Sequence, residues 1–227
     1  MLQHQILYED NHLIAINKLP GQIVQGDKTG DPCLADEIKD FLKLRDSKPG
    51  NVFCGVIHRL DRPVSGVVLF AKTSKALSRM NDMVKNHQLQ KTYWAITHNE
   101  PSPLHGHLED ALSRNEKLNK SFIVTPGSPN AKTAILDYRT IARSSGGYYL
   151  LEINLHTGRH HQIRCQLSHL GCPIKGDLKY GAPRSNPDGS ISLHAHSVSF
   201  LHPVRKEPIS IIAPWNCNNI PFDNTNY

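Results

Sequence analysis

The stretch VIHRLDRPVSGVVLFAKT, residues 56–73, joins a polar segment to a continuous apolar run. The apolar run VVLFA, residues 67–71, predicts a strand that is buried on both faces. Thr73 follows this run and predicts the N-cap of a helix, because a threonine hydroxyl accepts hydrogen bonds from free backbone N–H groups in the first turn. We therefore expect a core strand followed by a surface helix, with the polar residues at the entrance to the strand.

Three charged side chains stand at that entrance. Asp61 lies between Arg59 and Arg62. Pro63 disfavours a helical conformation at the residue before it, so the segment is predicted to be a turn. Neighbouring cations favour the ionised form of a carboxylate, which suits a nucleophile or a charge stabiliser better than a general acid. A salt-bridged aspartate that closes a turn is the alternative interpretation.

Apolar patterns and turn residues predict further strands on both sides of this stretch. Residues 6–18 contain two short apolar runs around an Asp-Asn pair, which predicts a β-hairpin. The segment KTYWAIT at 91–97 is β-branched and aromatic, as strands are. Two apolar runs that flank SSGG at 144–147 predict a second hairpin. The polar, mostly basic residues 113–120 are expected to form a loop.

Two further helices are predicted. Asp31 as N-cap and Pro32 as the first helical residue begin one of them. The apolar residues of its buried face are Leu34, Ile38, Phe41 and Leu42. Residues 156–171 predict the other, with Thr157 as N-cap and Gly171 as the C-terminal stop. Because the strands recur as hairpins and do not alternate with helices, we expect an α+β fold.

The segment TGRHHQIR, residues 157–164, supplies a second cluster of candidate residues. His160 and Arg164 are four residues apart and would share one face of the predicted helix. Arg164 adjoins the apolar stripe, so we expect it to be half buried and to need an anion. A phosphate or a carboxylate such as Asp61 can supply that charge. An exposed helix arginine is the alternative.

An aromatic pair in the strand at 91–97 is a further candidate. Tyr93 and Trp94 alternate faces, so one is expected in the core and the other can face a cleft. An aromatic ring beside basic residues can stack on a nucleic acid base, although a core position is the simpler interpretation.

Composition limits the partners and the cellular setting. The 227 residues contain 26 Lys plus Arg and 20 Asp plus Glu, which gives a net charge of +6. This excess favours a polyanion such as nucleic acid, although a merely basic surface is the alternative. The start of the chain does not resemble a signal peptide, and no stretch approaches the length of a membrane span. The five cysteines form no C-x-x-C pair, so we expect a cytoplasmic protein with reduced thiols.

Fourteen histidines raise the question of a metal site. Some are closely spaced, and metal ligands use such spacings. With so many histidines, chance pairs are frequent, and no H-E-x-x-H motif or carboxylate cluster accompanies them. We therefore expect no metal.

Four segments together resemble the RluA-type pseudouridine synthases. HRLDRPVSG resembles the family motif H-R-L-D-x-x-[TS]-S-G, KTYWA resembles K-x-Y-x-A, and LHTGRHHQIR resembles L-x-T-G-R-x-H-Q-I-R. GCPIKGDLKYG at 171–181 is similar to G-x-P-[IL]-x-G-D-x-x-Y-G. The resemblance extends from about Ile6 to Trp215. Two residues depart from the pattern: Val64 replaces the commoner Thr, and Gln166 stands where the family often has His.

This resemblance implies a fold and an organisation. The expected fold is α+β, with a bifurcated, mainly antiparallel mixed sheet, flanking helices and a central catalytic cleft. The expected organisation is a single catalytic domain over 1–227, with its core at about 6–215 and without the S4 RNA-binding domain that many members carry.

The resemblance also implies an activity, the isomerisation of specific uridines to pseudouridine in ribosomal large-subunit RNA or transfer RNA. It makes Asp61 the catalytic carboxylate, Tyr93 a residue that stacks on the base or moves a proton, and Arg164 the partner of Asp61. The residues expected to bind RNA are His58, Arg59, Arg62, Lys91, Arg159 and His160. The reaction includes no redox or phosphoryl-transfer step, so no cofactor is expected, and the enzyme is expected to act as a monomer away from membranes.

Three other functions stay open. A non-catalytic RNA-binding protein would keep the basic surface without needing Asp61. A nucleoside or glycoside hydrolase would also attack at C1′, but hydrolases usually use two carboxylates and only one lies in a motif here. A histidine-based metallo-hydrolase is the third alternative.

Overall fold

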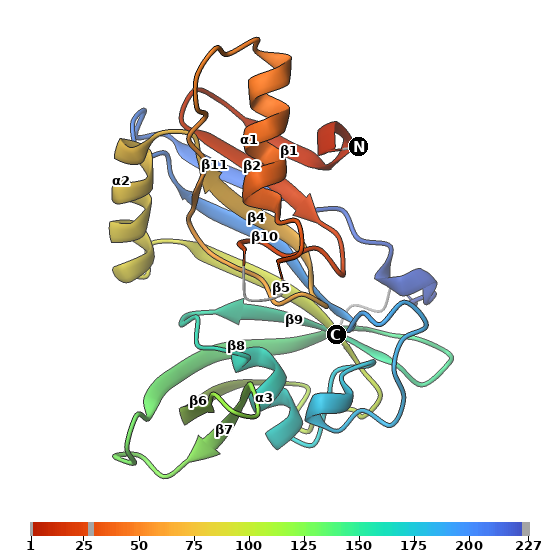
Figure 1. Ribbon diagram of the computed structural model, residues 1–227. Coiled ribbons are helices and arrows are strands. Elements are labelled where there is room, and N and C mark those ends of the chain that lie inside the picture. The colour runs from red at the N-terminus through yellow and green to blue at the C-terminus, as the bar shows by residue number, and fades with distance from the viewer. Residues whose placement is uncertain (1, 27–29, 224–227) are drawn as a thin grey trace. The chain divides into compact units, whose positions relative to one another are not determined.

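The computed structural model describes residues 2–26 and 30–223. The chain divides into two compact units, and each is described by itself. The first unit contains the described residues of Met1–Gln90 and Ala195–Pro214, and the second those of Lys91–His194 and Trp215–Tyr227. Figure 1 labels the helices and most of the strands of both.

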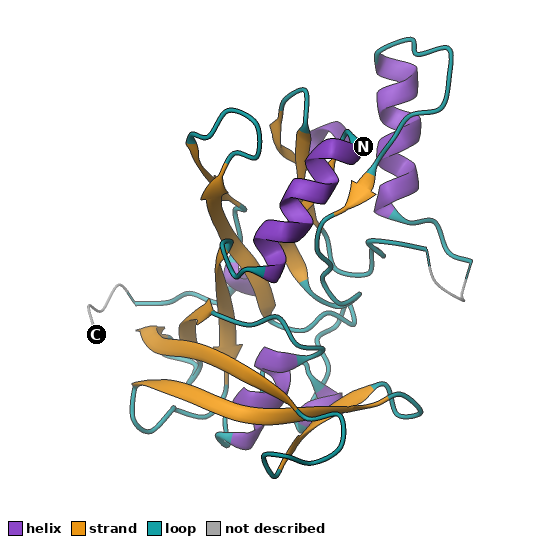
Figure 2. Ribbon diagram, turned by 90° about the vertical axis from the view of Figure 1, so that its left-hand side faces the viewer, coloured by secondary structure: helices purple, strands orange, loops and turns teal. Residues whose placement is uncertain are grey.

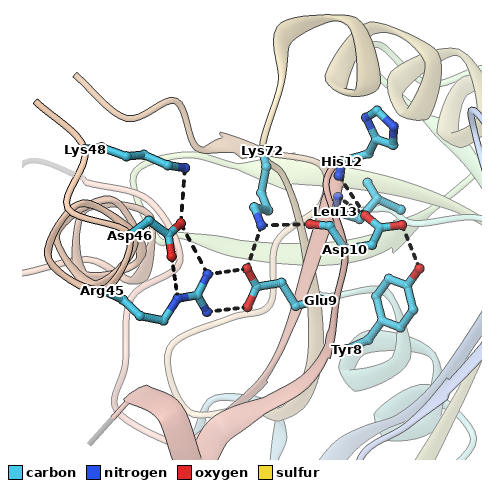
Figure 3. Close-up of polar contacts among 9 residues, drawn as sticks. All are labelled: Tyr8, Glu9, Asp10, His12, Leu13, Arg45, Asp46, Lys48 and Lys72. Atoms are coloured by element: carbon cyan, nitrogen blue, oxygen red, sulfur yellow. Dashed lines mark hydrogen bonds and ion pairs between the residues drawn. The ribbon is translucent and has the colours of Figure 1, made fainter. Parts of the chain in front are cut away.

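The first unit is built on a β-sheet. Its strands are β1 (Ile6–Glu9), β2 (Leu13–Lys18), β4 (Ser65–Ala71), β10 (Leu193–Leu201) and β11 (Pro208–Ile212), in that order across the sheet, and the short β3 (Gly55–Val56) pairs with β4. All seven residues of β4 are buried, which confirms the predicted core strand. The predicted N-terminal hairpin is confirmed as β1 and β2. The carboxylate of Asp10 closes its turn by accepting the backbone N–H groups of His12 and Leu13, both at 2.7 Å (Figure 3).

Two helices and a 3-10 turn, η1 (Leu2–Gln5), complete this unit. Helix α2 (Ser74–Lys85) begins as predicted, with the Thr73 hydroxyl accepting the Ala76 N–H at 3.2 Å. Helix α1 (Leu34–Arg45) buries the predicted Leu34, Ile38 and Leu42 against β2 and β4, and the predicted Phe41 is partly buried. The predicted cap at Asp31 is wrong. The backbone is still extended at Cys33, which pairs with Ile23 in an isolated bridge and is itself the N-cap.

An ion-pair network ties the N-terminal hairpin to the end of α1 (Figure 3). The Arg45 guanidinium donates two hydrogen bonds of 2.7 Å to Glu9, and it also pairs with Asp46. Lys72, which follows β4, donates to Glu9 at 2.6 Å and to the Asp10 carbonyl at 2.7 Å. These contacts, chiefly the hydrogen bonds from Arg45, lower the pKa of Glu9 to about 2.

The second unit is built on a five-stranded antiparallel sheet. The strands lie in the order β5 (Gln90–Thr97), β9 (Tyr149–Leu155), β8 (Lys132–Arg143), β6 (His105–Asn115) and β7 (Lys120–Val124). Strands β8 and β9 are the predicted second hairpin. The predicted loop at 113–120 is confirmed for residues 116–119 and wrong for the other four, because β6 continues to Asn115 and β7 starts at Lys120. Only the tight turn between these two paired residues lies outside the strands.

Helix α3 (Gln162–His169) contacts β6, β7 and the 3-10 turn η2 (Leu178–Tyr180), and the unit also contains the 3-10 turn η3 (Cys217–Asn219). Figure 2 distinguishes helices, strands and loops by colour. The helix starts five residues after the predicted cap at Thr157. His161 interrupts the helical backbone with a left-handed φ of 53°, and the Thr157 hydroxyl instead bonds the Ile135 N–H and the Gln162 side chain. Gly171, with φ of 82°, follows the last turn as predicted.

These elements confirm the α+β class and the mainly antiparallel pairing. Among the residues described, no helix combines the length and apolar character that a membrane crossing needs. All five cysteines lie in the described part and are free thiols.

Candidate active site

Asp61 lies on a tight turn immediately before the buried strand β4. The backbone N–H of Val64 donates to the Asp61 carbonyl at 3.0 Å, which closes a turn over residues 61–64. Val64 is buried, and the Asp61 side chain is only partly exposed. The turn predicted from Pro63 is therefore present, and it holds the carboxylate at the start of a strand whose seven residues are all buried.

The basic residues around Asp61 have different surroundings. Arg62 is exposed, yet its guanidinium donates to the Gly21 carbonyl at 3.1 Å and pairs with Asp31 at 3.0 Å. The Nε2 atom of His58 accepts the backbone N–H of Leu69 at 3.2 Å, which ties the ring to β4. Arg59 is exposed and forms no hydrogen bond or ion pair with any residue that the structure describes. Arg59 is therefore a cation that an anionic ligand can contact without breaking a hydrogen bond or ion pair to a described residue.

A buried lysine lies beneath this turn, and the sequence reasoning missed it. The Lys18 side chain at the end of β2 is fully buried, and its ammonium donates to the carbonyls of Arg62 at 3.0 Å and Val64 at 2.5 Å, and to that of Leu19 at 3.0 Å. Burial lowers the pKa of Lys18 to about 7, the charge of Asp61 opposes this shift and that of Arg62 adds to it.

A sequence signal for Lys18 was available. In LIAINK, residues 13–18, Lys18 is in phase with Ile14 and Ile16, and alternate residues of a strand share a face. Because both isoleucines are fully buried, a lysine at the third position of that face is expected inside the protein.

In the second unit, strand β5 presents Lys91 and Tyr93 on one face. The two are separated by one residue, so they share a face, and Trp94 points to the other. Tyr93 is buried and pairs in register with Ile153 of β9. The Lys91 ammonium lies beside Gly158. A Cβ atom at position 158 would be only 3.3 Å from the Lys91 nitrogen. Burial lowers the pKa of Lys91.

Arg164 is more deeply buried than predicted and has a carboxylate partner that was not anticipated. Its side chain is 6% exposed and donates from Nε and Nη2 to Asp177 at 2.6 and 2.8 Å. The Asp177 side chain is 1% exposed. The guanidinium also lies over the ring of Tyr180, 5.1 Å from its centre. Asp177 thus supplies an anion that Arg164 was expected to need, and the predicted pairing with Asp61 stays a prediction.

Arg159 and His160 lie in the segment before α3. Arg159 donates to the Thr133 carbonyl at 2.9 Å. The His160 ring stacks on His161, with 3.8 Å between ring centres, and its two nitrogens lie 2.9 Å from the Ser121 hydroxyl and 3.1 Å from the Asn119 side chain. His160 is outside the helix, so the prediction that it shares a helical face with Arg164 is wrong.

Each unit therefore gathers part of the predicted site. The first brings together His58, Arg59, Asp61 and Arg62, with Lys18 beneath them. The second carries Lys91, Tyr93, Arg159, His160 and Arg164. Across residues 2–26 and 30–223, no group of three or more His, Cys, Asp or Glu side chains is arranged to hold a metal ion.

Comparisons with known proteins agree with the motifs. The family model described as RNA pseudouridylate synthase matches residues 12–169. The chain is 30% identical over 230 residues to a tRNA pseudouridine synthase C from Pectobacterium carotovorum subsp. carotovorum, which covers 93% of this chain and 59% of the relative. It is 34% identical over 225 residues to a ribosomal large subunit pseudouridine synthase D from Xylella fastidiosa, which covers 92% and 65% respectively. The chain thus spans less than two thirds of the length of either relative.

A solved structure shares the fold. The human protein RNA pseudouridylate synthase domain containing 4 superposes with a TM-score of 0.76 at 26% identity, covering 97% of this chain and 90% of the human chain. The family model alone matches more than half of the sequence. This protein belongs to the RNA pseudouridylate synthase family, as the resemblance of its motifs to the RluA-type members predicts.

Proposed function

We propose that this protein is an RNA pseudouridine synthase and that Asp61 is its catalytic carboxylate. The observation that carries the proposal is the setting of Asp61 in its H-R-L-D segment. The carboxylate is partly exposed, it stands on a hydrogen-bonded turn at the start of a fully buried strand, and the charge of a buried lysine acts on it. Such a setting fixes the position of the carboxylate at the start of the buried strand.

The proposed reaction breaks the N1–C1′ bond of a uridine, turns the uracil and joins C5 to C1′. The C5 proton leaves to solvent and N1 gains a proton, so the product is an isomer of the substrate. The carboxylate of Asp61 acts at the sugar, either by covalent addition or as a base that yields a glycal. The target base must leave the RNA stack, because the bond to be broken is inaccessible in folded RNA.

The other residues have supporting roles in this proposal. Tyr93 stacks on the base or takes part in proton transfer, and Arg164 pairs with Asp61 as well as with Asp177. Exposed Arg59 contacts phosphates or fills the space that the flipped uridine leaves. Lys91, His58, Arg62, Arg159 and His160 complete the RNA contacts. Existing bonds of Arg62 and Arg159 to carbonyl oxygens support a fixed orientation for those two side chains.

The substrate is proposed to be ribosomal or transfer RNA in the cytoplasm. One relative is named for each RNA class, and the two are similarly close to this chain. The identities of 30% and 34% do not favour either class. Mapping pseudouridines in total RNA from a deletion strain and its complemented parent identifies the target site.

The Asp61→Asn variant tests the mechanism. Total RNA from the deletion strain, labelled with tritium at uridine C5, releases tritium only when the C5 proton is lost. We expect wild-type protein to release tritium and Asp61→Asn to release none, with RNA affinity retained because the substitution changes charge and little volume. Asp82→Asn, an exposed carboxylate on α2, is the matched control and should retain full activity.

The same assay separates the alternatives. Tritium release by Asp61→Asn at the wild-type rate would refute the role of this carboxylate. Free uracil in the products would indicate a hydrolase. RNA binding without release by the wild type would indicate a non-catalytic RNA-binding protein, and loss of activity on chelation would indicate a metallo-enzyme.

A further inference from the structure

We propose that the loop at residues 182–192 is an additional RNA contact of this protein, in which Arg184 binds a backbone phosphate and buried Asn186 positions it. The loop follows the segment similar to G-x-P-[IL]-x-G-D-x-x-Y-G, and Arg184 and Asn186 belong to none of the recognised motifs. This inference rests on the proposed action of the protein on RNA.

The shape of the loop is fixed by a side chain inside it. Asn186 is 4% exposed, and its side-chain oxygen accepts the Lys175 ammonium at 2.6 Å. Its amide nitrogen donates to the hydroxyls of Ser190 and Ser192, both at 3.2 Å. The chain before the loop packs tightly on it, because a Cβ atom at Gly176 would lie 2.8 Å from the Asn186 Cγ atom. Asn186 thus ties the loop both to residues 175–176 and to its own last residues.

The beginning of the loop is held as well. The backbone N–H of Ala182 donates to the Asp177 carbonyl at 3.0 Å, and Asp177 is the residue whose carboxylate pairs with Arg164. Arg184 lies between the two anchors, two residues after Ala182 and two before Asn186. Because the backbone on both sides of Arg184 is already held, a ligand that binds there orders little more than the arginine side chain.

The positive charge of Arg184 is not paired within the part of the chain that the structure describes. Arg184 is exposed and forms no hydrogen bond or ion pair with a described residue. Lys179, exposed in the same segment, donates to the neutral carbonyl of Asn119 at 3.1 Å. Asp188 is the carboxylate of the loop, and its Oδ1 atom accepts the N–H and the hydroxyl of Ser190 at 3.0 and 2.6 Å. The segment therefore presents two exposed cations that no described carboxylate pairs with.

An RNA phosphate is the anion that suits this arrangement. A guanidinium group binds a phosphate through two parallel hydrogen bonds, and the proposed substrate carries one phosphate for each nucleotide. Three exposed arginines of the first unit behave differently, because each already has a carboxylate partner. They are Arg45, Arg62 and Arg205. Their charges are used within the protein, whereas the charge of Arg184 is available to a ligand.

RNA binding by Arg184→Gln and Arg184→Lys tests the phosphate contact. The probes are transfer RNA and large-subunit ribosomal RNA from the deletion strain, each measured at several salt concentrations. We expect Arg184→Gln to raise the Kd by about five- to eightfold at about 0.1 M salt. It should also lower the slope of log Kd against log salt concentration by about 0.7 to 0.9, the effect of one phosphate contact. Arg184→Lys keeps the charge, so its slope should equal that of the wild type.

Arg139→Gln is the matched control, because it removes the same charge from an exposed arginine of the same unit. The Arg139 side chain is 62% exposed and pairs with Glu152. Glu152 lies opposite both Arg139 and Trp94, so these residues share the sheet face that Tyr93 does not. We expect Arg139→Gln to keep the wild-type slope and a Kd within about twofold. If it weakens binding as much as Arg184→Gln, or if Arg184→Gln binds as the wild type does, the inference is overturned.

Asn186→Ala tests the positioning role, because Asn186 is buried and uncharged. We expect this variant to lower the salt slope although it removes no charge, and the double variant with Arg184→Gln to bind no more weakly than Arg184→Gln alone. Additive effects, or a wild-type slope in Asn186→Ala, would refute the positioning role. Urea unfolding checks that the variant is folded, and Ser190→Ala, which removes one partner of the Asn186 amide, replaces it if it is not.

Tritium release keeps the inference and the proposed function apart. If wild-type protein releases tritium and Arg184→Gln binds RNA with the wild-type Kd and slope, the inference alone fails. If Arg184→Gln weakens binding as expected and wild-type protein releases no tritium, the phosphate contact is supported and the proposed reaction is wrong. Wild-type protein that binds neither RNA overturns both.

Discussion

The buried pair of Arg164 and Asp177 gives a prediction whose size follows from the structure. Both side chains are nearly inaccessible, at 6% and 1% exposure, and two hydrogen bonds of 2.6 and 2.8 Å join them. Removing one partner of a buried ion pair costs about 3 to 5 kcal/mol. The ring of Tyr180 beneath the guanidinium offsets about 1 kcal/mol of this cost. We therefore expect Asp177→Asn to lower the free energy of unfolding by about 2 to 4 kcal/mol.

Tryptophan fluorescence during urea unfolding measures this change in the free energy of unfolding in the second unit, where Arg164 and Asp177 lie. Both tryptophans of the chain, Trp94 and Trp215, belong to the second unit, which also holds the pair. The signal therefore reports the unit in which the substitution is made. A cycle of Arg164→Gln, Asp177→Asn and the double variant isolates the coupling between the two side chains, which we expect to reach about 2 kcal/mol.

An exposed pair in the same unit serves as the control. Arg139 and Glu152 approach to 2.9 Å, but their side chains are 62% and 22% exposed. Solvent screens such a pair, so Glu152→Gln should cost less than about 1 kcal/mol. If Asp177→Asn costs no more than Glu152→Gln, or if the cycle shows additive effects, the Arg164 contact contributes nothing specific and the reasoning from burial is refuted.

Two further predictions concern the first unit. Because the pKa of Glu9 is lowered to about 2 from 4.5, its contribution to stability is complete above about pH 4.5 and is lost as the pH falls towards 2. Glu9→Gln should therefore lower the free energy of unfolding by about 1 to 3 kcal/mol at pH 7 and make stability depend less on pH between 4.5 and 2. Calorimetry that shows the same pH dependence in the variant and the wild type contradicts this. Gly66 has φ of 113°, and a methyl group there would clash with the backbone of Ala195 in β10. Gly66→Ala should therefore lower Tm by more than 5 °C, roughly the effect of 2 kcal/mol in a chain of this size. If the variant keeps the Tm of the wild type, β4 and β10 can move apart enough to accept the methyl group, and the prediction is wrong.

Local patterns were sufficient to predict most elements of the fold. The apolar run at 67–71 became β4, which is buried along its whole length, since a strand covered on both faces requires apolar residues throughout. The cap at Thr73 was predictable because its contact is with a residue only three positions away. The turn before β4 was predictable for the same reason, since Pro63 acts on its immediate neighbours.

Distant contacts explain what local patterns missed. Helix α3 starts late because Thr157 and the Gln162 side chain bond Ile135, a residue of β8 more than twenty positions away in sequence. Asp177 stands at a fixed position of the segment similar to G-x-P-[IL]-x-G-D-x-x-Y-G, but nothing near it in the sequence shows that its carboxylate meets Arg164. The residues at 113–120 are polar, yet they extend a hairpin because β6 and β7 pair with each other.

Lys18 is a charged residue at a position where the packing of the strand favours an apolar side chain. It occupies the same buried face of β2 as Ile14 and Ile16, where an apolar side chain would maintain the packing. A pKa lowered from 10.5 to about 7 corresponds to a cost on the order of 5 kcal/mol for keeping the ammonium protonated. Three carbonyl contacts offset part of that cost, but a methionine would avoid it entirely. Packing alone therefore gives no reason for a lysine here, whereas the carbonyls of Arg62 and Val64, in the turn that carries Asp61, need a donor at this position.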